Sequence, residues 1–158
     1  MGKREICMKI LPFDIFVIHT EKSIPEIKKK LNEHIDDKHV FNFLYSNKQY
    51  EGEIYENGFK VSRIISYRNS FLPVLHGSFK ENKKGTDIII KMKLHKLVSV
   101  FMIIGIFAFS FGAVSSALEK DHNFIPLVFL IVFVSIIPFA FHWEGEKAKN
   151  YFNDLFNQ

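Results

Sequence analysis

The chain has 158 residues, a net charge of +4 and a single cysteine, Cys7. One cysteine excludes an intrachain disulfide and a cysteine-based zinc site. Residues 1 to 96 hold 18 of the 21 Lys and Arg but 12 of the 17 Asp and Glu, whereas residues 97 to 158 are mostly apolar. The composition therefore indicates a basic domain followed by hydrophobic segments.

The first elements of the basic part are a strand and a helix. Residues 13–18 are typical of a strand. The sequence Ser-Ile-Pro-Glu at residues 23–26 is a capping box with proline in the first turn, so it predicts the start of a helix. The helix would carry one apolar stripe, formed by Ile24, Ile27, Leu31 and Ile35. Residues 40–45 predict another strand.

Two hairpins follow. Asn57-Gly58 predicts a type I′ turn between residues 50–56 and 59–67, with Glu56 facing Phe59 and Arg63 opposite Gly52. Residues 72–80 and 86–96 form the second hairpin, in which Lys80 faces Asp87 and Glu81 faces Thr86. This second register gathers apolar residues on one face, which a slip by one residue would scatter: Pro73, Leu75, Gly77, Phe79, Ile88, Ile90, Met92 and Leu94.

Two uncharged runs then predict a transmembrane hairpin over residues 97–143. Leu97 to Leu118 and Phe124 to Trp143 are each about 30 Å long as helices, which is enough to cross a bilayer. Basic residues stand before the first run and after the second: Lys91, Lys93, Lys96, Lys147 and Lys149. By the positive-inside rule, both termini lie in the cytoplasm and the protein belongs to the cytoplasmic (plasma) membrane.

The tail, residues 144–158, predicts an amphipathic helix. Its stripe is Ala148, Tyr151, Phe152, Leu155 and Phe156. We expect this helix to dock on the sheet; the alternative is that it lies on the membrane surface. The predicted class is therefore α+β: an antiparallel β-meander with one N-terminal helix in a cytoplasmic domain (1–96), then the transmembrane hairpin (97–143) and the C-terminal amphipathic helix (144–158).

Arg63 is the most unusual residue of the predicted sheet, because it shares a face with apolar neighbours. Its guanidinium must bond carbonyls or a carboxylate, or bind an anion such as a phosphate or a lipid headgroup. The candidate residues for binding an anion or a partner are Arg63, Tyr67, Arg68, Asn69 and His76. The candidates for the lipid interface are Lys91, Lys93, His95, Lys96, His142 and Trp143.

The sequence predicts no catalytic residue, metal site or cofactor. The histidines lack metal-binding spacing, and Ser70 lacks the Gly-x-Ser-x-Gly context of a nucleophile. The basic charge is mixed with acidic residues and no reader motif appears, so nucleic acid is not an expected partner. Gly105 and Gly112 let helix backbones approach, and this favours contacts within the hairpin or a homo-oligomer formed through the membrane helices.

The stretch Phe59 to Val74, with Gly77, Gly85-Thr86 and Leu94-His95 entering Phe101-Met102, resembles a group of small bacterial membrane proteins. These have a β-rich cytoplasmic part followed by two hydrophobic segments. The resemblance implies no particular activity. More distantly, the arrangement is similar to bacterial pleckstrin-homology-type membrane proteins, by analogy of fold alone.

Two functional hypotheses follow from the sequence. In the first, the cytoplasmic domain is tethered at the inner leaflet and binds a protein partner or an anionic lipid. In the second, the protein is a membrane-bound enzyme acting on an anionic lipid or a phosphate compound through Arg63, Arg68, His76 and His95. The absence of a catalytic motif favours the first.

Overall fold

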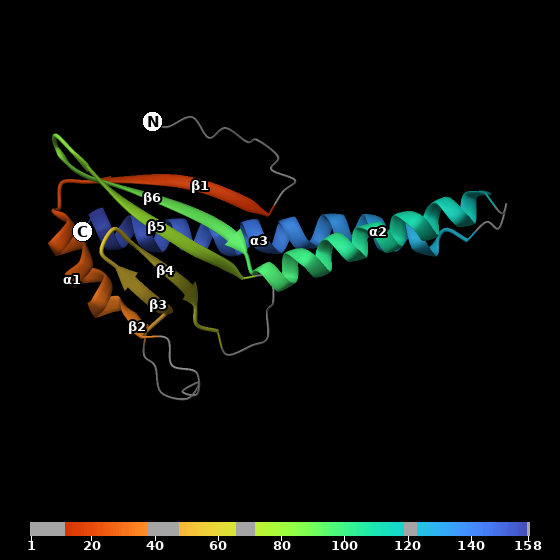
Figure 1. Cartoon of the computed structure of the whole chain (residues 1–158), viewed down its shortest axis with the longest axis horizontal. Helices are drawn as coiled ribbons and strands as arrows, with labels where there is room; N and C mark the ends of the chain where they lie inside the picture. Colours follow the sequence, from red (N-terminus) through yellow and green to blue (C-terminus); the bar gives the residue numbers. More distant parts are fainter. Residues whose placement is uncertain (1–11, 38–47, 66–71, 119–122, 158) are drawn as a thin grey trace.

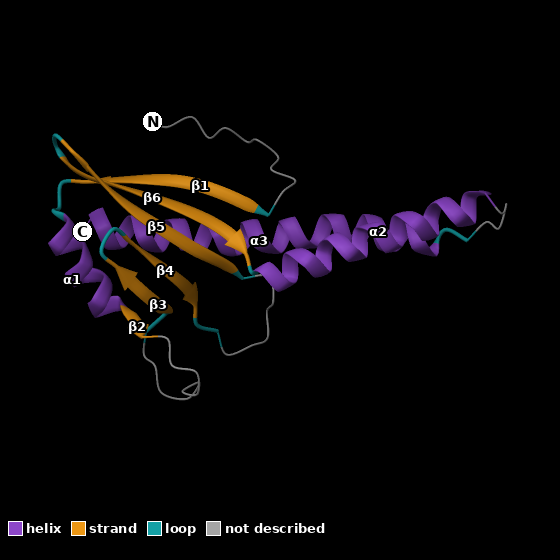
Figure 2. Ribbon diagram, viewed as in Figure 1, coloured by secondary structure: helices purple, strands orange, loops and turns teal. Residues whose placement is uncertain are grey.

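The computed structural model describes residues 12–37, 48–65, 72–118 and 123–157. It has an α+β fold with a six-stranded mixed sheet and three helices, two of them long and apolar (Figures 1 and 2). The predicted α+β class is confirmed. The predicted strand at residues 40–45 lies outside the described residues.

The elements in chain order are β1 (Phe13–Thr20), α1 (Ile24–His34), β2 (Ile35–Asp37), β3 (Tyr50–Tyr55), β4 (Gly58–Arg63), β5 (Pro73–Asn82), β6 (Gly85–Leu94), α2 (Lys96–Leu118) and α3 (Ile125–Asn157). The strand order in the sheet is β1-β6-β5-β4-β3-β2.

The sheet is not a simple antiparallel meander. Strands β3, β4, β5 and β6 pair with one another in chain order, and all three pairs are antiparallel. In contrast, β1 pairs with β6, and β2 runs parallel to β3. The reason is α1, which carries the chain from one edge of the sheet to the other (Figure 1). The helix ends at His34 because Ile35 takes an extended conformation (φ −110°, ψ 134°) and begins β2, although the apolar stripe predicted it as helical.

The N-terminus of α1 agrees with the sequence. Ser23 is the N-cap, and its backbone N–H donates to Glu26 Oε2 at 2.7 Å, which is one half of the predicted capping box. Ile27 and Leu31 of the predicted stripe are fully buried.

The first hairpin has a different register from the predicted one. Gly58 pairs with Tyr55, so the turn residues are Glu56 and Asn57, and Arg63 faces Tyr50 rather than Gly52. Gly58 belongs to the strand because β5 approaches it closely: a Cβ built at Gly58 would lie 2.2 Å from the carbonyl oxygen of Gly77. Because the error is two residues, every side chain keeps its predicted face.

The second hairpin has the predicted register. Lys80 pairs with Asp87 and Glu81 pairs with Thr86. Gly85 has a φ of 135°, which a residue with a side chain rarely adopts, so glycine suits the end of this turn. The predicted apolar face is turned inward, and its most buried members are Pro73, Leu75, Ile88, Ile90, Met92 and Leu94.

The helices α1 and α3 cover one face of the sheet, which we call the inner face; the opposite face is the outer face. Phe152 of α3 is fully buried, with ring centroids 5.1 Å from Tyr50 and 5.7 Å from Phe59. Phe156, Leu155 and Ala148 join the same core. The tail therefore docks on the sheet, as expected, and does so as the continuation of a 33-residue helix rather than as a separate one.

The other half of α3 lies beside α2, away from the sheet (Figure 1). Both helices are long and apolar enough to cross a membrane. A Cβ built at Gly105 would lie 2.8 Å from Phe133, and one at Gly112 would lie 3.3 Å from Pro126. The small residues are thus occupied by the neighbouring helix of the same chain, which leaves these two glycines less able to support a homo-oligomer.

Replacing Phe152 with alanine tests the docking of α3. We expect Phe152→Ala to lower the free energy of unfolding by about 3–5 kcal/mol, because it leaves a cavity between two aromatic rings of the sheet. Thermal unfolding followed by circular dichroism in detergent would measure the change. The neighbouring exposed Asn153→Ala is the control and should change stability by less than about 0.5 kcal/mol. Equal effects of the two substitutions would contradict the docking.

Candidate functional site

Arg63 is held by a carboxylate of α3. It ends β4 on the inner face, and its Nη1 donates to Glu144 Oε2 at 2.6 Å. Glu144 is buried and also accepts from Lys147 Nζ at 2.9 Å. Burial raises the pKa of Glu144, but the hydrogen bonds from Lys147 and Arg63 outweigh it and hold that pKa below its ordinary value. The sequence left three kinds of partner open for Arg63: a carbonyl, a carboxylate or a bound anion. In the structure its partner is a carboxylate, that of Glu144.

A second ion pair joins α3 to the opposite edge of the sheet. Lys149 Nζ lies 2.8 Å from Asp14 Oδ2 of β1 and 2.7 Å from Glu146 Oε1. Burial lowers the pKa of Lys149, but the bonds to these two carboxylates outweigh burial, so the pKa lies above its ordinary value. Together with Glu144, Lys149 fixes α3 both to β1 and to β4. These contacts orient the helix; they do not form a catalytic arrangement.

The structure does not bring the predicted anion-binding residues together. Tyr67, Arg68 and Asn69 lie outside the described residues. Arg63 points to the inner face, whereas His76 is exposed on the outer face of β5, between Lys60 of β4 and Lys91 of β6. Partial burial, Lys60 and Lys93 lower the pKa of His76. A joint active site of Arg63 and His76 therefore has no geometric basis.

The predicted lipid-interface residues cluster where the sheet meets the two long helices. Lys91 and Lys93 are exposed on β6, and His95 and Lys96 stand at the start of α2. Trp143 is exposed on α3, with Lys147 Nζ 5.6 Å from its ring centroid. His142 Nδ1 lies 2.7 Å from the carbonyl oxygen of Pro138. This grouping suits a membrane boundary.

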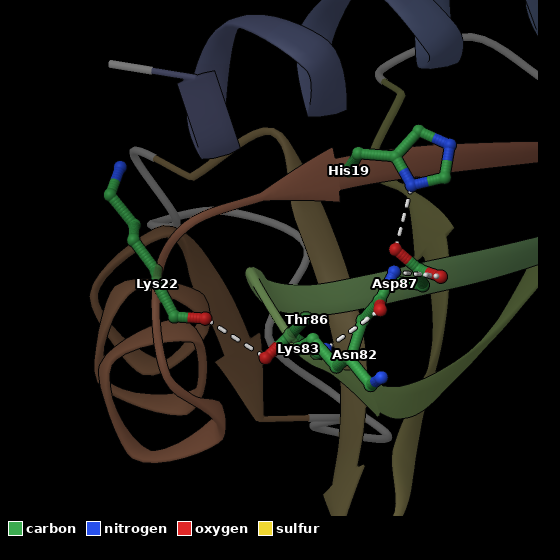
Figure 3. Close-up of polar contacts among 6 residues, drawn as sticks. All are labelled: His19, Lys22, Asn82, Lys83, Thr86 and Asp87. Atoms are coloured by element: carbon green, nitrogen blue, oxygen red, sulfur yellow. Dashed lines mark hydrogen bonds and ion pairs between the residues drawn. The ribbon is translucent and has the colours of Figure 1, made fainter.

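Sequence reasoning missed a polar cluster at the opposite end of the sheet (Figure 3). His19 Nδ1 lies 2.6 Å from Asp87 Oδ1, and Asn82 Nδ2 donates to Asp87 Oδ2 at 3.4 Å. These hydrogen bonds, that of His19 foremost, lower the pKa of Asp87. The cluster borders a cleft of about 350 Å³. Its two threonines are engaged with backbone: Thr86 donates to the Lys22 carbonyl and Thr20 to that of Phe156.

A histidine held by a carboxylate is the base-and-orienter part of a catalytic triad. The described residues supply no nucleophile beside this histidine, because the hydroxyls of Thr86 and Thr20 both donate to backbone carbonyls. Within the same residues, no group of three or more His, Cys, Asp or Glu is placed to hold a metal ion. His19 and Asp87 are directly opposite each other on β1 and β6, so their contact is explained as a cross-strand pair that stabilises the sheet.

A second cleft, of about 270 Å³, opens on the outer face near the start of α2. It is lined by Glu51, Gly52, Glu53, Lys60, Val61, Ser62, Val74 and His95. It combines carboxylates, an ammonium and an imidazole within one hollow. Among the predicted residues that the structure describes, His95 alone lines this cleft.

No family model, curated protein or solved structure matches the chain. Its function must therefore be argued from its own geometry and charge.

The buried Glu144 predicts an acid-sensitive fold. Because the pKa of Glu144 is lower in the folded state than its ordinary value of 4.5, the ionised carboxylate stabilises the fold at pH values above 4.5. This stabilisation is lost as the pH falls through the folded-state pKa. We expect the free energy of unfolding to decrease between about pH 5 and pH 3, with a shallower decrease in Glu144→Gln. That variant should also be less stable by about 1–3 kcal/mol near neutral pH. Thermal unfolding across this pH range is the measurement.

Glu146→Gln serves as the control for this acid sensitivity. Glu146 also pairs with a lysine, Lys149, but its side chain is exposed. Its pH profile should follow that of the unchanged protein. If Glu144→Gln also follows it, the buried ion pair does not contribute to stability.

Proposed function

We propose that the chain is an integral membrane protein whose α+β domain is held at the cytoplasmic leaflet, where it binds a protein partner or an anionic lipid. The observation that carries this proposal is that α3 is one helix of 33 residues, or about 50 Å. About 30 Å of it would cross the hydrocarbon, and the remainder lies in the core of the domain. The sheet is thereby fixed to the membrane segment without a flexible linker.

The charges around the apolar segments support the orientation. Lys91, Lys93 and Lys96 stand before α2, and Lys147 and Lys149 follow the apolar part of α3. Both groups lie at the end of the helix pair that joins the sheet (Figure 1). The positive-inside rule places this end, and the domain with it, in the cytoplasm.

The outer face is the surface that the domain offers to a partner. Phe13, Ile15 and Val17 of β1 project from it and are between 38 and 46% exposed. Lys91 and Lys93 of β6 lie beside them, and Lys60 of β4 lies farther along the same face. An exposed apolar stripe next to positive charge is suited to a partner that carries apolar and acidic groups. Binding at the membrane would act by raising local concentration, with no catalytic step required.

Cysteine labelling tests the orientation. In a Cys7→Ser background, Asn123→Cys at the start of α3 should react with a membrane-impermeant maleimide added to intact cells. Asn57→Cys, in the turn between β3 and β4, should react only after the membrane is opened. Labelling of both sites from outside, or of neither before and after opening, would overturn the proposed topology.

Charge reversal on the outer face tests the binding surface. We expect Lys91→Glu to reduce the protein or lipid that co-purifies from detergent-solubilised membranes by about tenfold, because it replaces attraction with repulsion. Quantitative mass spectrometry of both fractions would measure the loss. The matched control is Lys29→Glu, an exposed residue of α1 in the other layer of the domain. If neither protein nor lipid is enriched with the unchanged chain, the tethering function is wrong.

A further inference from the structure

The cleft near the start of α2 lies where a phospholipid headgroup would be found. Its wall residues Glu51, Ser62 and Val74 occupy one row across β3, β4 and β5, level with Lys93. Glu53 and Lys60 belong to the next row. At about 3.3 Å per residue, these rows stand roughly 7 Å and 13 Å from His95 along the strand direction. His95 directly precedes α2 and marks the edge of the apolar segment.

This position corresponds to the polar layer of a bilayer. The headgroup regions add roughly 5–8 Å to each side of the hydrocarbon core. The first row therefore lies inside that layer when α2 spans the membrane. Lys60 and Glu53 stand about 5 Å beyond it on the cytoplasmic side, and the long side chain of Lys60 is able to reach back toward it.

The two walls of the cleft carry opposite charge. Glu51 and Glu53, both on β3, form an acidic wall. Lys60 and Ser62 of β4 and His95 supply donors on the other side. His95 Nδ1 accepts the backbone N–H of Leu97 at 3.4 Å, so the neutral ring carries its proton on Nε2, which is a donor. The positive end of the α2 dipole lies at the same place.

We propose that this cleft binds the headgroup of a phospholipid that carries both a phosphate and a primary ammonium, as phosphatidylethanolamine does. Lys60, Ser62 and His95 contact the phosphate, and Glu51 and Glu53 accept hydrogen bonds from the ammonium. The inference rests on the proposed function, since it requires α2 and α3 to span the membrane. It goes beyond that function, because the headgroup is zwitterionic and the two carboxylates in the cleft oppose a purely anionic one.

Lipid selectivity distinguishes this site from a general attraction to the membrane. A primary ammonium donates hydrogen bonds that a trimethylammonium cannot, so phosphatidylethanolamine should bind more tightly than phosphatidylcholine. The net charge of the cleft also disfavours phosphatidylglycerol. Native mass spectrometry of the full chain in detergent, titrated with each lipid in turn, measures these affinities. We expect a preference of roughly five- to tenfold for phosphatidylethanolamine over either competitor.

The variants separate the two walls. The double substitution of Glu51→Gln with Glu53→Gln should abolish the preference for phosphatidylethanolamine over phosphatidylcholine while leaving both able to bind. Lys60→Gln should weaken all three lipids. Glu33→Gln and Lys29→Gln on the exposed side of α1 are matched controls and should change nothing. Melting temperatures of each variant identify any that fail to fold.

Three results would overturn the proposal. Equal retention of the three lipids by the unchanged chain would show that the cleft does not select a headgroup. An unchanged preference in the Glu51→Gln and Glu53→Gln double variant would place the selectivity elsewhere. Binding of free phosphoethanolamine without any lipid preference would assign the cleft to a soluble ligand. The cysteine labelling described above reports separately on membrane insertion, so a failure of that topology is distinguishable from a failure of this site.

Discussion

Phe152 lies between Tyr50 and Phe59 at the centre of the domain, and the geometry of the whole molecule follows from that contact. Because α3 is continuous from Ile125 to Asn157, fixing its C-terminal part on the inner face also fixes the direction in which its apolar part leaves the sheet. The strands then run along the helix, so the outer face is turned sideways from the helix axis (Figure 1).

The two ion pairs give this contact its rotational setting. Hydrophobic packing is non-directional, so an aromatic core alone permits a helix to turn about its axis. Glu144 reaches Arg63 on β4 and Lys149 reaches Asp14 on β1, from either side of α3. A small rotation would break at least one of these pairs and leave a buried charge without its partner. The arginine that looked functional in the sequence is thus part of the attachment between sheet and helix.

Local patterns predicted the elements well, and long-range pairing was the part they did not contain. The capping box, the second hairpin register and the apolar stripe of the tail each depend on residues close in the chain, and each agrees with the structure. The pairing of β1 with β6 joins residues about 70 positions apart, for which periodicity carries no information. The sequence nonetheless contained two signals for the ion pairs of α3. Asp14 lies on the same face of its strand as the buried Ile18, and Glu144 lies on the same helical stripe as Ala148 and Phe152.

The place of Phe152 and Phe156 near the end of the chain has a consequence for biosynthesis. The sheet is complete in sequence at Leu94, yet the residues that cover much of its inner face are translated after both apolar segments. Until α3 has emerged, Leu75, Ile90 and Met92 have no helix from the C-terminal part to bury them. The domain therefore cannot close until both apolar segments have been translated, and the inner face of the nascent sheet stays partly uncovered until then.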